Sequence, residues 1–347
     1  MNSKLKIAII SLVGLIIIFV IYVAYQLYWK KSSNNFVDIA IKSGESVEEI
    51  VVDLKKSGVV SNAWLFKIYL KFSGQDKTIQ SGLGRIASGS ARNVAAALAG
   101  SRWNSTPYLF KEGWTVDDYD RVLFDGGIIS ERGLFAKLVG EPGVNYCLDT
   151  KKTKPRDFSA EYDFLKNKSA CHGLEGYLFP DTYYLSKNIS AEDATRIMLD
   201  NFDKKLTSDL RAQILRQGKT IEEIIIMASL IEAEARDERD RFIVSDILWR
   251  RLKVGMGLEL DSTVNYITGA GKPAISLVEK ETNSLYNTYK YRGLPPGPIN
   301  NPGLEAIVAA IYPVPNDYWF FLTGRDGQMY YAKNLEEHNR LKYLYLK

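Results

Sequence analysis

The sequence predicts an α+β protein that begins with a membrane-spanning helix. Three observations carry this prediction: a long uncharged apolar segment near the N-terminus, short strand patterns alternating with capped helix patterns, and enough apolar residues to fill a core. The 347 residues are 46% hydrophobic and 12% aromatic, which excludes a disordered chain. This length favours about two domains.

The first element is the apolar segment of residues 7–29, which contains no charged residue. As a helix it spans roughly 30 Å, the hydrocarbon thickness of a bilayer. Trp29 and several tyrosines at its end, followed by Lys30 and Lys31, are typical of a membrane interface and not of a cleaved signal peptide. The positive charges on the two sides nearly balance, so only the short tail of residues 1–6 favours a cytoplasmic N-terminus.

Three strand–turn–helix patterns follow the anchor and form a loose internal repeat, although any small α+β domain contains such steps. We expect strands at residues 36–41, 85–86 and 108–111, each followed by a helix, over residues 47–54, 91–98 and 116–123. The middle copy is degenerate, because Ala91 stands where the others have a capping hydroxyl.

The second half of the chain reads mainly as helices and loops. Residues 146–190 are loop-rich and aromatic, and residues 295–303 form a loop rich in proline and glycine. Helices are expected over residues 191–217, 220–232 and 241–253, and a final one after the cap residue Asn334. Residues 318–323 and 329–332 bracket a turn and predict a hairpin.

Composition excludes several classes of function. The net charge of +4 comes without a clustered basic stripe, so no nucleic-acid partner is expected. The chain has only two histidines besides Cys147 and Cys171, so neither a metal site nor a cofactor is expected. The two cysteines could form one disulfide in an oxidising compartment or remain free thiols, since spacing alone does not fix their geometry.

Glu232 is the strongest candidate for a catalytic residue. It ends an apolar helical run and shares a helix face with Ile225, Ala228 and Ser229. Partial desolvation on such a face raises the pKa of a carboxyl, which then keeps a proton for general acid catalysis. Glu234 lies about 200° around the helix, so it does not easily share the site. Alternatively, Glu232 only marks the point where a core helix becomes polar.

Six short blocks stand in order along the chain: Lys111–Thr115, Leu174–Tyr183, Ala228–Glu234, Leu260–Tyr266, Tyr286–Tyr289 and Gly293–Ile299. Together they resemble the MltG (YceG-like) family of endolytic murein transglycosylases, over roughly residues 36–345. The resemblance implies a LysM-like module over residues 36–107, a YceG-like catalytic domain over residues 108–347, and a body outside the cytoplasmic (inner) membrane. Ser262 stands where the family often has proline, and residues 72–107 match poorly.

The implied reaction cleaves the β-1,4 bond between N-acetylmuramic acid and N-acetylglucosamine within peptidoglycan strands. It leaves 1,6-anhydro ends and terminates nascent strands. Glu232 would be the single acid and base, because the C6 hydroxyl of the sugar replaces the second carboxylate of ordinary glycosidases. Penicillin-binding proteins are the implied partners. The alternative function is a non-catalytic scaffold that binds the cell wall and is anchored in the membrane.

The resemblance also nominates residues around Glu232. The candidates for holding the sugars are Asp261, Thr263, Asn287 and Tyr289, and Glu175 is a supporting group behind the site. Each has a structural alternative, because carboxyl, amide and hydroxyl side chains also cap loops and turns.

Overall fold

The computed structural model describes residues 3–31, 36–41, 45–79, 82–99, 105–186, 189–269 and 275–346. Met1 and Asn2 of the expected tail, and parts of the expected module, lie outside the described residues. Two compact units are present, residues 1–108 with 183–189 and residues 109–182 with 190–347. Helices and two-stranded sheets make up the described chain, which confirms the α+β class.

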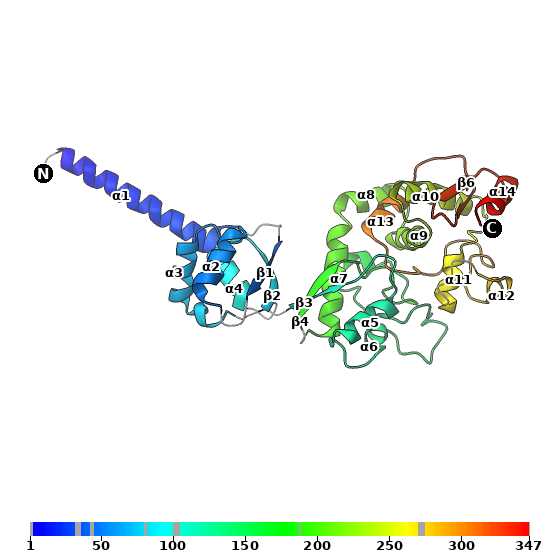
Figure 1. Cartoon of the computed structure of the whole chain (residues 1–347), viewed down its shortest axis with the longest axis horizontal. Coiled ribbons are helices and arrows are strands. Elements are labelled where there is room, and N and C mark those ends of the chain that lie inside the picture. The colour runs from blue at the N-terminus through cyan, green and yellow to red at the C-terminus, as the bar shows by residue number, and fades with distance from the viewer. Residues whose placement is uncertain are drawn as a thin grey trace. The chain divides into compact units, whose positions relative to one another are not determined.

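The N-terminal helix α1 (Ser3–Ala24) continues into the π-helix η1 (Tyr25–Trp29), as Figure 1 shows. The part from Ser11 to Trp29 is long and apolar enough to cross a bilayer, and none of it is buried in the protein. The tyrosine-rich end of this segment packs on the first unit, where the ring centroid of Tyr28 lies 6.2 Å from that of Tyr69.

The first unit is built on an antiparallel pair of strands. Strand β1 (Phe36–Ile41) pairs with β2 (Gly82–Ala87) in a register that sets Phe36 opposite Ala87. Helices α2 (Val47–Lys56), α3 (Ala63–Ser73) and the short η2 (Gln75–Lys77) lie between the strands in sequence, and α4 (Ala91–Ala99) follows β2. Leu54, Leu70 and Leu98 are fully buried in their common core.

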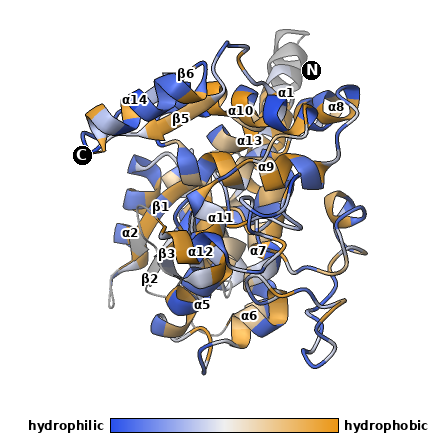
Figure 2. Ribbon diagram, turned by 90° about the vertical axis from the view of Figure 1, so that its right-hand side faces the viewer, coloured by the Kyte–Doolittle hydropathy of each residue, from blue (hydrophilic) through white to orange (hydrophobic). Residues whose placement is uncertain are grey.

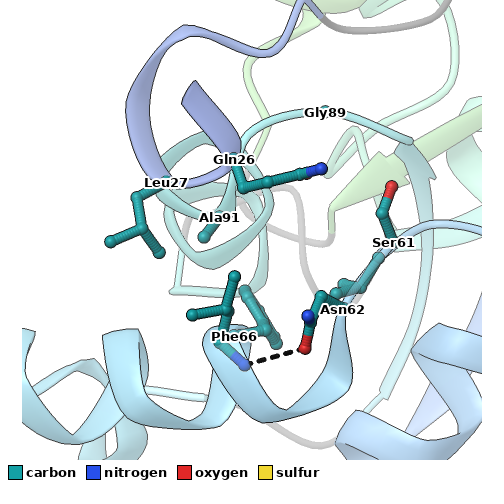
Figure 3. Close-up of a pocket in the computed structure, with 9 residues that line it drawn as sticks. Gln26, Leu27, Ser61, Asn62, Phe66, Gly89 and Ala91 are labelled. Atoms are coloured by element: carbon teal, nitrogen blue, oxygen red, sulfur yellow. Dashed lines mark hydrogen bonds between the residues drawn. The ribbon is translucent and has the colours of Figure 1, made fainter. Parts of the chain in front are cut away.

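A small pocket of the first unit lies where η1 meets α3 and α4 (Figure 3). Its lining residues include Gln26, Leu27, Asn62, Phe66 and Ala91. Asn62 also begins α3, because its Oδ1 accepts a hydrogen bond from the amide of Leu65 at 3.1 Å. The end of the apolar helix is therefore part of the packing of this unit.

The structure corrects the expected internal repeat. Strand β3 (Ser105–Leu109) pairs with β4 (Thr182–Ser186) and not with β1 and β2, and its following helix α5 (Val116–Asp125) lies in the second unit. The expected defect at Ala91 is also wrong. Ser90 is the capping residue of α4, since its Oγ accepts from the amide of Asn93 at 3.3 Å.

The single helix expected over residues 191–217 is two helices, α7 (Ala191–Lys205) and α8 (Ser208–Arg216). Leu206 leaves the helical conformation with ψ 74°, and its side chain is buried. Thr207 then caps α8 by accepting from the amide of Leu210 at 3.4 Å. A capping threonine inside an otherwise helical pattern therefore restarts the helix.

The centre of the second unit is helix α9 (Ile221–Glu234), which packs against α10 (Glu238–Lys253) and α13 (Leu304–Ile311). Figure 2 shows α9 and α13 largely in the hydrophobic colour. The capping box of Thr220 and Glu223 begins α9 as expected, and residues 224–231 are all buried. This packing fixes the end of α9, where Glu232 lies.

The remaining elements surround this centre. They are α6 (Leu134–Val139), η3 (Asp163–Leu165), α11 (Asp261–Thr268), α12 (Leu277–Lys280), the antiparallel strands β5 (Phe320–Thr323) and β6 (Met329–Ala332), and α14 (Leu335–Tyr345). The hairpin and the final helix capped by Asn334 confirm the sequence prediction. Cys147 and Cys171 form a disulfide with a Cα–Cα distance of 5.0 Å, which decides between the two alternatives for these residues.

Candidate active site

Glu232 lies in the last turn of α9, three residues before Ala235, the buried residue that ends the helix. Its side chain is only 7% exposed. The position follows from the local sequence, because the apolar run before it is buried against α10 and α13. Glu232 is thus a carboxyl at the edge of a core.

Both carboxyl oxygens of Glu232 accept a hydrogen bond. Nη2 of Arg241 donates to Oε1 at 3.1 Å, and the backbone amide of Gly303 donates to Oε2 at 3.1 Å. Arg241 comes from α10, and Gly303 is the residue immediately before α13. The two helices that pack on α9 therefore also fix the orientation of its carboxyl.

Burial raises the pKa of Glu232 above the usual range of a glutamic acid. The guanidinium of Arg241 and the amide of Gly303 act in the opposite direction, and the negative charges of Glu112 and Glu305 add to the rise. Burial is the largest of these effects. Glu232 therefore has the property that the sequence analysis required of a general acid, a proton retained closer to neutral pH.

Arg241 is itself nearly buried and has three acceptors. Besides Glu232 it donates from Nε to the carbonyl of Ala235 at 3.2 Å and forms an ion pair with Glu305 of α13. An arginine that donates from each of its three nitrogens in this way has little freedom to turn. Arg241 holds the end of α9 as well as the carboxyl.

Glu175 lies apart from Glu232, in a second buried network. Its Oε1 accepts from the amide of Val116 at 2.9 Å and from Nδ2 of Asn301 at 3.0 Å, and Tyr266 donates to Oε2 at 3.4 Å. Burial raises the pKa of Glu175 to about 8. A protonated carboxyl at this position is a fixed part of the scaffold and not a group open to a ligand.

Asn301 joins the segments that surround both glutamates. Its Oδ1 accepts from the amides of Gly176 and Leu178, at 2.9 and 3.2 Å. Its backbone carbonyl accepts from the amide of Gly113 at 2.9 Å, and its own amide donates to the carbonyl of Trp114 at 2.9 Å. Two of the six sequence blocks therefore meet at one buried asparagine, in the loop that follows the sixth block.

The other nominated residues lie on α11 and the loop that follows α12. The structure brings Asp261 and Tyr289 together, since the tyrosine hydroxyl donates to Oδ1 of Asp261 at 2.5 Å. Both are only partly buried. Ser262, next to Asp261, donates to Oε1 of Glu234 at 2.6 Å and so ties the start of α11 to the end of α9.

Thr263 and Asn287 are fully buried and are satisfied by the protein itself. The hydroxyl of Thr263 lies 2.8 Å from the carbonyl of Leu260 and 3.0 Å from the hydroxyl of Thr288. Nδ2 of Asn287 donates to two carbonyls, those of Lys280 and Thr282, each at 2.8 Å. In this conformation the two side chains hold the loop that carries Tyr289.

Comparisons with known proteins identify the family of this chain. A model of the YceG-like family matches residues 39–343 of the chain. The chain belongs to the YceG-like family. It is 32% identical over 322 residues to a Bacillus subtilis (strain 168) protein named endolytic murein transglycosylase, covering 91% of this chain and 87% of that protein.

Two further relatives extend the comparison. A Streptococcus pneumoniae (serotype 2, strain D39) protein of the same name is 29% identical, and the matched region is 89% of this chain but 58% of that longer protein. The crystal structure of a putative YceG-like protein from Listeria monocytogenes aligns with a TM-score of 0.58 at 28% identity, covering 89% of this chain and all of that one.

Sequence reasoning missed four residues around the site of this YceG-like protein. They are Glu112, Arg241, Asn301 and Gly303. Glu112 stands in the first of the six blocks, but no spacing in the sequence relates it to Glu232. Arg241 is nine residues after Glu232 and Gly303 is 71 residues after it. Only the packing of α10 and α13 on α9 reveals these contacts.

Proposed function

We propose that this YceG-like protein is an endolytic murein transglycosylase with Glu232 as its catalytic residue. The reaction cleaves the β-1,4 bond between N-acetylmuramic acid and N-acetylglucosamine inside peptidoglycan strands. The observation that carries the proposal is a nearly buried carboxyl, with raised pKa and both oxygens held by donors, in a chain whose relatives bear this enzyme name.

In the first step Glu232 donates its proton to the glycosidic oxygen, and the bond from that oxygen to C1 of the muramic sugar breaks. The glucosamine side leaves as an alcohol, and positive charge develops at C1. The raised pKa of Glu232 supplies the protonated form for this step. Arg241 and Gly303 keep the carboxyl from rotating while its charge changes.

In the second step the Glu232 carboxylate removes the proton of the C6 hydroxyl of the same muramic sugar, and O6 bonds to C1. The product is a 1,6-anhydro end, and Glu232 regains its proton. No water is consumed, which distinguishes this reaction from hydrolysis. One residue serves as acid and then as base because its protonation state alternates.

The sugar rings would be held by Asp261 and Tyr289, which are partly exposed and already hydrogen bonded to each other. The buried Thr263 and Asn287 would act by positioning that loop, and Glu175 by supporting the segments that meet at Asn301. Aromatic and carboxylate groups together suit sugars, which present apolar ring faces and hydroxyls.

The domain organisation belongs to the same proposal. Residues 1–6 would be a cytoplasmic tail and residues 7–29 the membrane anchor. Residues 36–107 would form the LysM-like module, for which the separate hydrophobic core of the first unit is the support. Residues 108–347 would form the catalytic domain. A cell-wall-binding module next to an anchor suits an enzyme that acts on strands made at the membrane surface.

The body of the protein would lie outside the cytoplasmic (inner) membrane. The disulfide between Cys147 and Cys171 supports this side, because disulfides persist in oxidising compartments and are rare in the cytosol. Peptidoglycan strands would be the substrate, and penicillin-binding proteins, which make such strands, are the proposed partners. Termination of nascent strands follows if cleavage occurs close to synthesis.

The test uses the full-length protein in detergent and purified glycan strands, with products identified by mass spectrometry. We expect 1,6-anhydro ends from the wild type and at least a 10³-fold loss of rate for Glu232→Gln, which keeps the shape but has no acidic proton to transfer. Glu131→Gln, at an exposed position outside the site, is the matched control. Wild-type rates from Glu232→Gln would refute the assignment.

The same experiment separates the alternatives. Reducing ends from the wild type would mean hydrolysis instead of transglycosylation. Binding of strands without any product would favour the non-catalytic scaffold. The names of the relatives favour the enzyme over the scaffold.

A further inference from the structure

Glu112 lies beside Glu232 although it comes from a distant part of the sequence. It belongs to the turn before α5, and the next two residues are tied to the loop before α13. The amide of Gly113 donates to the carbonyl of Asn301, and the amide of Asn301 donates to the carbonyl of Trp114, both at 2.9 Å. These paired backbone bonds fix the position of Glu112 against that loop.

The carboxyl groups of Glu112 and Glu232 both lie next to Gly303. A Cβ atom on this glycine would lie 2.8 Å from Oε2 of Glu112 and closer still to Oε1, so a side chain at position 303 would displace the carboxylate from this place. The amide of the same residue donates to Glu232. Since both contacts involve one residue, the nearest carboxyl oxygens of Glu112 and Glu232 are at most roughly 8 Å apart.

Gly113 makes room on the other side. It adopts a positive φ of 74°, and a Cβ atom there would lie 3.6 Å from Cγ of Glu232. The backbone of the turn thus lies close to the side chain of Glu232, while Glu112, one residue earlier, stays exposed to solvent. The arrangement keeps a second carboxylate near Glu232 but on the surface instead of inside the core.

The charge of Glu112 is not neutralised by an ion pair with any residue that the structure describes. Arg241 is occupied by Glu232, Glu305 and the carbonyl of Ala235. Lys111 lies over the ring of Trp114, with Nζ 5.4 Å from the centroid. Glu112 therefore acts on Glu232 without a neutralising ion-pair partner among the described residues.

We propose that Glu112 is a positioning residue for the proton of Glu232: its negative charge holds that proton in place and sets the upper limit of the pH range in which the enzyme works. The inference rests on the proposed function. Its physical basis is that a nearby like charge disfavours ionisation of a carboxyl. The effect helps both steps, because it also makes the Glu232 carboxylate a stronger base towards the C6 hydroxyl.

The other charged groups near Glu232 in sequence or in space cannot fill this role. Arg241 of α10 favours the ionised form, and Glu305 of α13 is paired with Arg241. Glu234, on the same helix, bonds to Ser262 of α11. Glu112 is thus the unpaired negative group among those that act on Glu232.

The activity test compares Glu112→Gln, Glu112→Asp and the control Glu131→Gln in the full-length protein. The rate of formation of anhydro ends is measured against pH. We expect Glu112→Gln to move the alkaline limb down by roughly one pH unit, because Glu232 then loses its proton sooner. Glu112→Asp keeps the charge and most of the wild-type profile, and Glu131→Gln changes nothing. An unmoved limb in Glu112→Gln would overturn the inference.

A direct titration separates this inference from the proposed function. The carboxyl of Glu232 is followed by carbon NMR in protein labelled at glutamate side chains, and Glu232→Gln assigns the signal. We expect Glu112→Gln to lower the pKa of Glu232, whether or not the protein cleaves glycan strands. If that pKa is unchanged, the inference fails even when Glu232 is catalytic. If it falls but no anhydro ends form, the proposed function fails alone.

Discussion

Arg241 and Glu232 form a nearly buried ion pair, with Nη2 3.1 Å from Oε1 and each side chain 7% exposed. Burial raises the pKa of the carboxyl, the guanidinium lowers it, and burial has the larger effect. An arginine keeps its charge at any working pH, so the pair persists as a hydrogen bond when Glu232 is protonated. The carboxyl can therefore change protonation state without changing position, which an acid that later acts as a base requires.

Replacing Arg241 should impair catalysis and shift its pH dependence upward. In Arg241→Met the opposing positive charge is gone, so the pKa of Glu232 rises further and the alkaline limb moves to higher pH. The carboxyl also loses one of its two donors, and we expect a fall of about 10²-fold in kcat/KM from lost orientation.

The measurement is the rate of anhydro-end formation across the pH range. Arg239→Met, an exposed residue in the first turn of the same helix, is the matched control. The shift should be opposite in sign to that of Glu112→Gln. A downward shift in Arg241→Met, or a wild-type rate, would show that the ion pair does not control the proton of Glu232.

Glu175 should make the stability of the protein depend on pH. Its pKa is about 8 in the folded state and near 4.5 in the unfolded state. The folded state therefore holds one more proton between these values, and stability falls as the pH rises from about 5 to about 8. In Glu175→Gln, whose amide oxygen can still accept from Val116 and Asn301, this part of the pH dependence should disappear.

Urea unfolding of the wild type and Glu175→Gln at both ends of this range checks the prediction. The wild type should lose a few kcal/mol more than the variant on going to the higher pH. Equal losses in the two proteins would mean that Glu175 is ionised throughout, or that it titrates as it does in the unfolded chain.

The sequence predicted what depends on neighbours along the chain. The capping box at Thr220 and the apolar run after it are local signals, and they were enough to predict α9 and the desolvated position of Glu232 at its end. The same reasoning failed at Thr207, because a cap residue inside a helical pattern divided one expected helix into two.

The surroundings of Glu232 could not be predicted in that way. Arg241, Gly303 and Glu112 reach it from three different segments, and none has a spacing that points to α9. The sequence offers no obvious second carboxylate for Glu232, because helical spacing compares only neighbours on the same helix. In the fold, Glu112 reaches the site through backbone bonds between two loops, which leave no periodic pattern in the sequence.

Asn301 should be essential for both stability and activity. Its side chain makes four hydrogen bonds, to Gly176, Leu178, Trp114 and Glu175, and is fully buried. In Asn301→Ala the amides it satisfies lose their acceptor, at a cost of about 1–3 kcal/mol for each group left unpaired. The loop that carries Gly303 also loses its anchor.

Urea unfolding of Asn301→Ala and its rate of anhydro-end formation test the two roles of Asn301. We expect a loss of about 3 kcal/mol or more in the free energy of unfolding and a lower rate even under conditions where the variant is folded. Asn339→Ala, at an exposed position of α14, should change neither quantity. A folded Asn301→Ala with full activity would contradict the role given to this residue.

The disulfide should contribute to stability under oxidising conditions only. Cys147 and Cys171 are 24 residues apart, and closing a loop of this size stabilises the folded state by about 3 kcal/mol. The double variant Cys147→Ser, Cys171→Ser should unfold at a lower urea concentration than the wild type. A thiol reductant should lower the wild-type midpoint towards that of the variant and leave the variant unchanged; a wild type insensitive to the reductant would refute this contribution.

Tyr289 tests whether the pair that it forms with Asp261 contacts the substrate. Its hydroxyl donates to Oδ1 of Asp261 at 2.5 Å, so Tyr289→Phe leaves a carboxylate without that donor and removes one polar group from the surface next to α11. If the pair binds a sugar ring in the ground state, KM for glycan strands should rise by roughly tenfold while kcat changes little. Tyr291→Phe is the matched control, because that hydroxyl bonds to Asn283 at 2.7 Å in the same loop. An unchanged KM and kcat in Tyr289→Phe would mean that the sugar-binding surface does not include this pair. A lower kcat at constant KM would mean that the pair contacts the substrate only in the transition state.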